Sequence, residues 1–229
     1  MTEIGIILTP DVRSKVYLKK IIDNNIILKE VILMDDDKSE KKYSQEEITE
    51  SKKCNFDISK SVEGLLIQAN LQFKKFDFID INHAKLINYL KQSSIDFFIF
   101  TGGGILKKDV LNASPKFVHF HPGIIPHYRG STCFYYSIIN EDFCGVTAYL
   151  MEEGLDDGPI LYQKTFQKPN HIFLDNVFDA HIRSETLLDV LKNNLLEKEK
   201  GIKQDTSKGE IYFIIHPVLK HIAILSCVK

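Results

Sequence analysis

The sequence lacks clustered cysteines, a long apolar run and a large net charge. Its four cysteines form no Cys-x-x-Cys pair, and no positively charged leader followed by an apolar segment opens the chain. We therefore expect a reduced, cytoplasmic protein. The cysteines are Cys54, Cys133, Cys144 and Cys227.

The apolar runs are all far shorter than the roughly 20 residues that a membrane-crossing helix needs. The net charge is -2, and the sequence pI of about 6.4 gives no general electrostatic reason to bind a polyanion. We expect neither a membrane span nor a nucleic-acid partner.

The length of 229 residues suits one substantial core. We expect residues 1–200 to form a catalytic domain, and residues 201–229 to add a C-terminal strand pair or lid to that same domain. The strand pair is expected at Ile211 to Ile215 and His221 to Leu225, on either side of Pro217.

Short apolar runs alternate with amphipathic segments along the chain. Ile4 to Thr9 and Leu28 to Met34 read as strands around a helix that ends near Ile22, and Ile95 to Phe100 reads as a buried central strand. This order predicts an α/β fold, with an open, mostly parallel twisted sheet, Rossmann-like, and helices on both faces. Ligands of such sheets bind beyond the carboxyl ends of the strands. Nearly every residue from Asp35 to Lys53 is charged or polar, which predicts a solvated loop or weak surface helix without function.

Two histidines and a carboxylate indicate a proton-transfer site. His119 and His121 stand beside a Pro122-Gly123 turn, and Asp156 follows some thirty residues later. A carboxylate can orient an imidazole and raise its basicity. The alternatives are a core histidine, an Asp that only shapes a turn, and a metal site made by His119, His121, His127 and Cys133. We expect no metal, because the segment holds two prolines and offers no clean fourth ligand.

A glycine run follows the central strand. Gly102 to Gly104 let the backbone approach a ligand, since they carry no Cβ. A phosphate loop and a structural tight turn are the other interpretations, although the run lacks the Gly-Lys-Ser/Thr ending of a phosphate loop.

Aromatic and basic residues beyond the turn are candidate substrate contacts. Arg129 could hold a phosphate through two parallel hydrogen bonds, or the segment Tyr128, Arg129 and Gly130 could be a surface turn. One of Phe134, Tyr135 and Tyr136 could stack on a base or sugar, but core packing is the stronger interpretation. His216 and His221 could reach the site as part of a lid.

Four pieces in order resemble the folate-dependent formyltransferases, the family of glycinamide ribonucleotide formyltransferase, methionyl-tRNA formyltransferase and the sugar N-formyltransferases. The resemblance covers residues 76 to 166 well, and the Thr101 to Leu106 loop resembles the family's cofactor loop. The pieces are His119 to Pro122, Pro126 to Gly130, Gly145-Val146-Thr147, and Asp156 to Gly158.

The resemblance implies a role for each piece. His121 and Asp156 would manage the proton of an attacking amine, and His119, where the family has Asn, would donate to the oxyanion. Tyr128, Arg129 and Gly130 would border the acceptor. The formyl-folate would be held by Gly103, Gly104, Ile105, Leu106, Glu152, Glu153 and Gly154.

The activity that the resemblance implies is transfer of a formyl group from N10-formyltetrahydrofolate to the primary amine of a nucleotide-linked amino sugar, in surface polysaccharide or nonulosonic acid synthesis. A tRNA acceptor is not expected, because no basic C-terminal tail follows the motifs. The alternatives are a glycinamide ribonucleotide or other amine formyltransferase, a formyl-folate hydrolase and a non-catalytic folate- or nucleotide-binding module. A homodimer is left open.

Overall fold

The computed structural model describes residues 2–37, 41–113, 115–197 and 201–228. The chain forms two compact units, the first up to His119 and the second from Phe120. Both of these residues belong to the strand β5, Lys116–His121, so the division falls within one strand.

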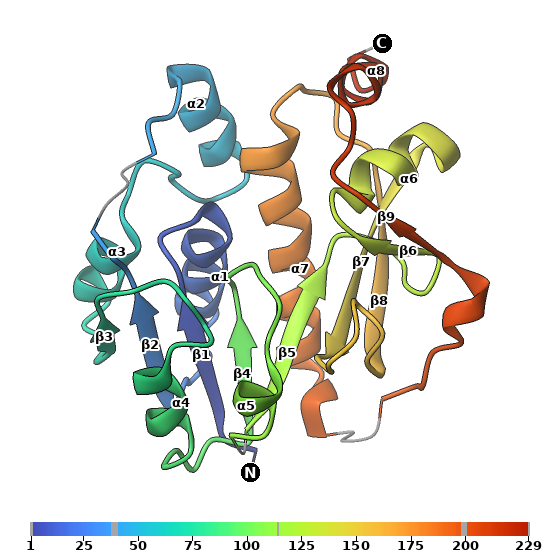
Figure 1. The fold of residues 1–229 in the computed structure, drawn as a ribbon. Helices are drawn as coiled ribbons and strands as arrows, with labels where there is room; N and C mark the ends of the chain where they lie inside the picture. The colour runs from blue at the N-terminus through green and yellow to red at the C-terminus, as the bar shows by residue number, and fades with distance from the viewer. Residues whose placement is uncertain (1, 38–40, 114, 198–200, 229) are drawn as a thin grey trace. The chain divides into compact units, whose positions relative to one another are not determined.

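The first unit is built on parallel strands in the order β3-β2-β1-β4-β5 (Figure 1). All of β4 and most of β1 and β2 are buried, as a parallel sheet with both faces covered requires. Besides β5, these strands are β1 (Ile4–Leu8), β2 (Glu30–Met34), β3 (Lys74–Phe76) and β4 (Phe97–Phe100).

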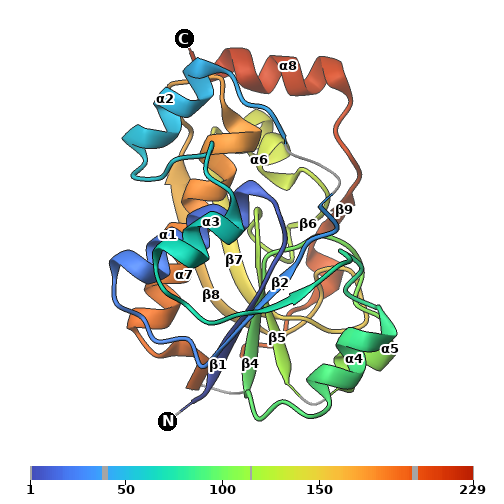
Figure 2. The ribbon, with the colours of Figure 1, turned by 90° about the vertical axis from the view of Figure 1, so that its left-hand side faces the viewer.

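Side-chain caps begin most helices of this unit. Asp11 accepts from the backbone N–H of Ser14 at the start of α1, and Ser44 and Glu47 form a capping box at α2. Figure 2 shows α1 and α3 on one side of the strands and α4 and α5 on the other. The helices are α1 (Val12–Asp23), α2 (Gln45–Lys53), α3 (Val62–Gln68), α4 (Ala84–Leu90) and α5 (Lys108–Leu111).

The second unit contains the end of β5 and the strands β7 and β8, in the order β5-β7-β8, together with a small parallel pair, β6 with β9. The strands β7 and β8 are antiparallel, and α6 and α7 pack on β7. Its strands are β6 (Tyr128–Gly130), β7 (Phe143–Leu150), β8 (Ile160–Gln167) and β9 (Glu210–Tyr212).

The helices of the second unit include one π-helical turn, which leads directly into α7. They are α6 (Cys133–Glu141), the π-helical turn (Leu174–Phe178), α7 (Asp179–Lys192), two 3-10 turns (Leu195–Glu197 and Thr206–Lys208) and α8 (Pro217–Ser226).

The structure confirms the expected open, mostly parallel α/β sheet with helices on both faces, and it corrects one detail. Of the two expected C-terminal strands, β9 forms near the first, whereas His221 to Leu225 lie in the helix α8. Pro217 occupies the first turn of α8, where its missing N–H costs nothing, and the His216 side chain accepts from the backbone N–H of Val218. The single domain expected over the whole chain stays a prediction.

Candidate active site

His121 is the last residue of β5, and both of its ring nitrogens face protein oxygens. Its side chain is buried, with only 2% of the residue exposed. Nε2 donates to the carbonyl of Tyr128 at 2.9 Å, because a carbonyl can only accept. Nδ1 lies 3.3 Å from Oδ2 of Asp156. The structure therefore brings the expected imidazole and carboxylate together.

Three groups besides His121 hold the side chain and backbone of Asp156. Oδ2 accepts from the backbone N–H of Gly130 at 2.7 Å, and Oδ1 accepts from the phenol of Tyr149 at 2.7 Å. The side-chain amide of Gln204 donates to the Asp156 carbonyl at 3.0 Å. Asp156 itself has a left-handed backbone, with φ of 50°. These contacts fix a buried carboxylate in one orientation beside His121.

The charge state of His121 follows from its surroundings. Burial lowers the pKa of His121 from its ordinary value of 6.5, the carboxylate of Asp156 opposes that shift, and the guanidinium of Arg183 adds to it. A neutral imidazole carries one proton, whereas the Tyr128 carbonyl and the Asp156 carboxylate can both only accept a proton. Both contacts are hydrogen bonds at once only when the ring is protonated at both nitrogens, and the charge of Asp156 stabilises that cation.

His119 precedes His121 by two residues in β5 and belongs to the first unit. Its side chain is half-buried, and Nδ1 lies 3.3 Å from the carbonyl of Phe100 at the end of β4. Since this carbonyl can only accept, Nδ1 carries the proton of a neutral ring, and Nε2 is then an acceptor. Nε2 of His119 becomes a donor only when the ring is protonated at both nitrogens.

The turn after His121 is fixed by the third motif of the resemblance. The Thr147 hydroxyl donates to the carbonyl of Gly123 at 2.7 Å and accepts from the backbone N–H of Ile125. Gln163 in β8 donates to the carbonyl of Ile125 at 2.7 Å. A Cβ at Gly145 would lie 2.3 Å from the side chain of Ile124, so the strand must carry glycine there. The Gly-x-Thr piece therefore positions the Pro-Gly turn.

The segment Tyr128, Arg129 and Gly130 forms the strand β6 and is not an open surface turn. Arg129 is 9% exposed, and its guanidinium donates to the carbonyl of Thr206 at 3.1 Å. Nε of Arg129 is buried without a hydrogen-bond partner among the described residues. The ring of Tyr128 stacks on Tyr212 of β9, and its hydroxyl donates to Glu141. β9 thus holds the expected acceptor segment.

The glycine loop of the first unit is open to solvent where the resemblance implies a ligand. Gly103, Gly104 and Ile105 are exposed, with Ile105 71% exposed, and Leu106 is buried. Gly104 has φ of +102°, and a Cβ built on it would meet no atom within 4 Å. Asn82 clamps the loop, since it donates to the carbonyl of Ile105 and accepts from the backbone N–H of Lys107.

The other segment expected at the folate lies in the second unit, before Asp156. Glu152, Glu153 and Gly154 are exposed. A Cβ at Gly154 would lie 1.7 Å from Oδ2 of Asp157, so this position requires glycine. Gln204 also donates to the carbonyl of Gly158 at 2.7 Å and so closes this turn from the C-terminal side.

The remaining candidates lie on the helices α6 and α8. Phe134 and Tyr135 are buried in α6, as core packing requires, and the ring of Tyr136 lies tilted against Tyr212. His216 caps α8, and His221 is exposed on the same helix. No group of three or more metal-ligating side chains occurs in the part of the chain that the structure describes.

Sequence reasoning missed three residues around the pair. Tyr149 and Gln204 hold Asp156, and Arg183 bridges Asp179 (2.8 Å) and the carbonyl of Phe120 (3.0 Å), the residue before His121. A charged pair at i and i+4 in a predicted helix was the one available signal, for Asp179 and Arg183. The other two partners are set by tertiary contacts.

The sequence matches one family along most of its length. The formyl transferase family matches residues 25–171, more than half of the chain, and the chain therefore belongs to this family. Methionyl-tRNA formyltransferase of Wolbachia pipientis subsp. Culex pipiens (strain wPip) is 36% identical over 107 residues, which are 44% of this chain and 35% of that protein. The match thus spans about a third of that relative's length.

Solved structures share the fold at low sequence identity. A sugar N-formyltransferase from Shewanella sp. FDAARGOS_354 aligns with a TM-score of 0.62 at 19% identity, over 100% of this chain and 89% of that one. An N-formyltransferase from Helicobacter canadensis, in complex with folinic acid and dTDP-3-aminofucose, aligns with a TM-score of 0.64 at 16% identity, over 100% and 81%. Within the described ranges, no helix has the length and apolar content of a membrane span.

Proposed function

We propose that this protein transfers the formyl group of N10-formyltetrahydrofolate to the primary amine of a nucleotide-linked amino sugar. The single observation that carries the proposal is the buried pair of His121 and Asp156, 3.3 Å apart, in a chain of the formyl transferase family. The complex of the Helicobacter canadensis protein with folinic acid and dTDP-3-aminofucose supports both ligand classes.

The reaction forms one bond and breaks another at the formyl carbon. The neutral amine attacks, the carbonyl oxygen becomes an oxyanion, and the C–N10 bond then breaks while N10 takes up a proton. The amine loses a proton, which His121 would accept and Asp156 would stabilise by its charge. For His121 to accept this proton at Nε2, the contact between Nε2 and the Tyr128 carbonyl must open, and the ring must carry its own proton at Nδ1, facing Asp156.

His119 would serve the oxyanion. With Nδ1 held at the Phe100 carbonyl, Nε2 can donate to an oxyanion only from a doubly protonated ring, which adds a positive charge where negative charge develops. The role that the family gives to an amide would thus fall to an imidazolium in this chain.

The glycine loop supports the folate assignment. Exposed backbone groups at Gly103 and Gly104, next to the exposed apolar side chain of Ile105, suit a flat heteroaromatic ring that needs both hydrogen bonds and an apolar face. Leu106 anchors the loop in the core. We assign the exposed Glu152, Glu153 and Gly154 to the same ligand.

The acceptor would meet Tyr128, Arg129 and Gly130. The unpartnered Nε of Arg129 leaves one donor of its planar guanidinium for an acidic group, and a diphosphate is such a group. A polysaccharide or nonulosonic acid pathway remains part of this proposal.

The test is formyl transfer to a panel of amines. Purified protein is incubated with N10-formyltetrahydrofolate and either dTDP- and UDP-linked amino sugars, glycinamide ribonucleotide or charged tRNA. Mass spectrometry then detects a product heavier by one formyl group. We expect His121→Ala and Asp156→Ala to lower turnover by about 10² or more. The matched controls His127→Ala and Asp157→Asn should stay within about threefold.

Other outcomes would replace the proposal. Release of formate at full rate without any amine would indicate a hydrolase. A formylated product with glycinamide ribonucleotide, and with no other amine of the panel, would indicate an enzyme of purine synthesis. Absence of any product, with folate binding unchanged in His121→Ala, would indicate a non-catalytic binding module.

A further inference from the structure

The first unit contains a cavity of about 540 Å³ that formyl transfer, as proposed above, does not use. It opens where β1 and β2 end, at the side where ligands of parallel sheets bind. Its volume lies within the range of about 300 to 1,000 Å³ that small-molecule sites occupy. The residues around it are Pro10, Lys15, Asp35, Asp37, Lys41, Tyr43, Ser59, Ser61, Val62 and Glu63.

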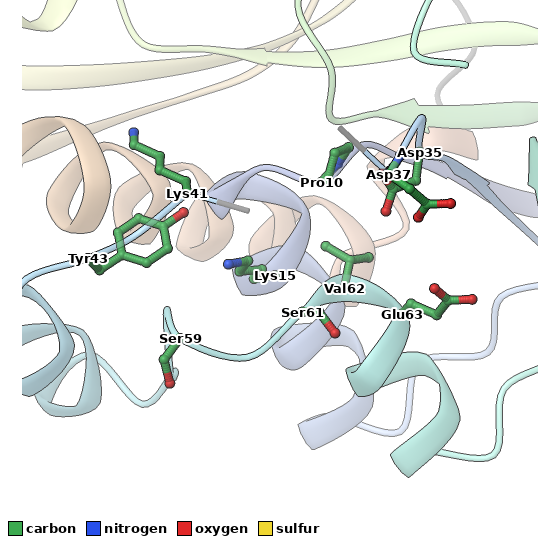
Figure 3. A pocket seen from close by; sticks show the side chains of 10 residues that line it. All are labelled: Pro10, Lys15, Asp35, Asp37, Lys41, Tyr43, Ser59, Ser61, Val62 and Glu63. Carbon is green, nitrogen blue, oxygen red and sulfur yellow. Dashed lines mark hydrogen bonds between the residues drawn. The ribbon is translucent and has the colours of Figure 1, made fainter. Parts of the chain in front are cut away.

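The cavity has two ends of opposite character. Figure 3 shows Lys15, Lys41 and Tyr43 toward one end and the carboxylates of Asp35, Asp37 and Glu63 toward the other. A ligand that fits both ends carries an anionic group at one end and hydroxyl groups at the other.

The cationic end is built around a buried ammonium. Lys15 is 8% exposed, donates to the carbonyl of Ile58 at 2.7 Å, and lies 4.8 Å from the centre of the Tyr43 ring. Lys41 lies 5.8 Å from the centre of the same ring. Burial raises the pKa of Tyr43 to about 12, so its phenol stays protonated and can donate to an anion.

The acidic end is already ordered. Lys75 bridges Asp37 at 3.1 Å and Glu63 at 3.0 Å, and this neutralises much of their charge. Asp35 directly follows β2, and its Oδ1 accepts from the backbone N–H of Asp37. A carboxylate that follows the second strand is suited to accept from sugar hydroxyls, and Oδ2 of Asp35 would be the accepting oxygen.

We propose that this cavity binds a phosphorylated sugar, either free or as the ribose-phosphate part of a nucleotide. The phosphate lies at Lys15, Lys41 and Tyr43, and a sugar hydroxyl donates to Asp35. The phosphate does not use the N-terminus of α1, because Pro10 has no N–H and Asp11 places a carboxylate there.

The experiment is calorimetric titration of the full chain with ribose 5-phosphate, uridine 5′-monophosphate, ribose and inorganic phosphate. It needs no formyl donor, so its failure leaves the proposed reaction untouched. Because both ends contribute, ribose 5-phosphate should bind at least about tenfold more tightly than ribose or inorganic phosphate. If uridine 5′-monophosphate displaces ribose 5-phosphate and binds more tightly, the natural ligand is a nucleotide. If it binds no more tightly than ribose 5-phosphate, the natural ligand is a free sugar phosphate.

Three variants locate the site. Asp35→Asn should weaken ribose 5-phosphate about tenfold and leave inorganic phosphate unchanged, whereas Lys41→Ala should weaken both. Lys42→Ala, next to the cavity in sequence but outside its lining, is the matched control and should stay within about twofold. Both test positions lie near the surface, so the variants should fold, unlike a replacement of Lys15. Equal affinity for ribose 5-phosphate and inorganic phosphate, or no effect of both variants, would overturn the proposal.

Discussion

Tyr149 donates its phenolic proton to Oδ1 of Asp156 at 2.7 Å, from a buried position in β7. Burial and the neighbouring carboxylate raise the pKa of Tyr149, so this proton stays on the phenol. The contact holds a carboxylate whose other oxygen faces both His121 and the backbone of Gly130.

Removing this hydroxyl should destabilise the protein and slow formyl transfer. Tyr149→Phe leaves a buried carboxylate oxygen without its donor, which costs about 1 to 3 kcal/mol of unfolding free energy. Urea denaturation measures this loss. The control is Tyr162→Phe, because Tyr162 meets Asp189 at 3.4 Å in a half-buried position, and we expect it to cost less than about 0.5 kcal/mol. Equal losses of unfolding free energy in the two variants would show that the hydrogen bond to Asp156 stabilises the protein no more than the half-buried contact of Tyr162 does.

Gln204 should be a positioning residue for Asp156. Its amide donates to the carbonyls of Asp156 and Gly158, so Gln204→Leu removes both hydrogen bonds, and Gln204→Glu turns a carboxylate toward the two carbonyls. We expect turnover to fall about tenfold in the first variant and further in the second. The exposed neighbour Lys203 provides the control, Lys203→Ala. Unchanged steady-state kinetics in Gln204→Glu would remove Gln204 from this role.

An amide should be able to replace the imidazole of His119 if this position only donates a hydrogen bond to the oxyanion. His119→Asn supplies an amide NH2 donor, and we expect turnover within about threefold of the native chain. His119→Leu has no donor and should lower turnover by about 10² to 10³. Steady-state kinetics measure both variants. An inactive Asn variant with an unchanged urea midpoint would mean that the imidazole does something that an amide cannot.

Stability should fall in mild acid because of His121. Burial lowers the folded-state pKa of His121 below 6.5, so the unfolded chain binds a proton first as the pH drops. The contribution is complete above the unfolded pKa of about 6.5 and is lost as the pH falls toward the folded pKa. His121→Asn should flatten the unfolding free energy in this window. Denaturant titrations at several pH values measure the slope, with His127→Asn as the exposed control.

The sequence predicted most of the elements that carry the site. Ile95 to Phe100 is apolar without interruption, which only a strand covered on both faces tolerates, and β4 lies there. The motif around His121 and the Asp-Asp-Gly turn are local signals, and the structure brings them within 3.3 Å. These patterns could be recognised in the sequence because each depends on residues that lie close together in the chain.

Other features depend on contacts that local patterns do not encode. His221 to Leu225 is a short apolar run that suits a strand or a helix equally, and the helix is decided by Pro217 and the cap at His216. Tyr149 and Gln204 reach Asp156 through the fold, and nothing in their neighbouring residues indicates that partner. The cavity at Asp35 lies in a polar segment where no function was expected, because polar composition alone does not distinguish a solvated loop from the wall of a cavity.

The pairing of β6 with β9 couples the segment Tyr128 to Gly130 to residues near the C-terminus. A Cβ at Gly130 would lie 2.2 Å from the carbonyl of Tyr212, so a larger residue at position 130 would push the two strands apart. A substitution that displaces β9 should therefore also move the backbone N–H of Gly130 away from Oδ2 of Asp156, although the two positions lie far apart in the sequence.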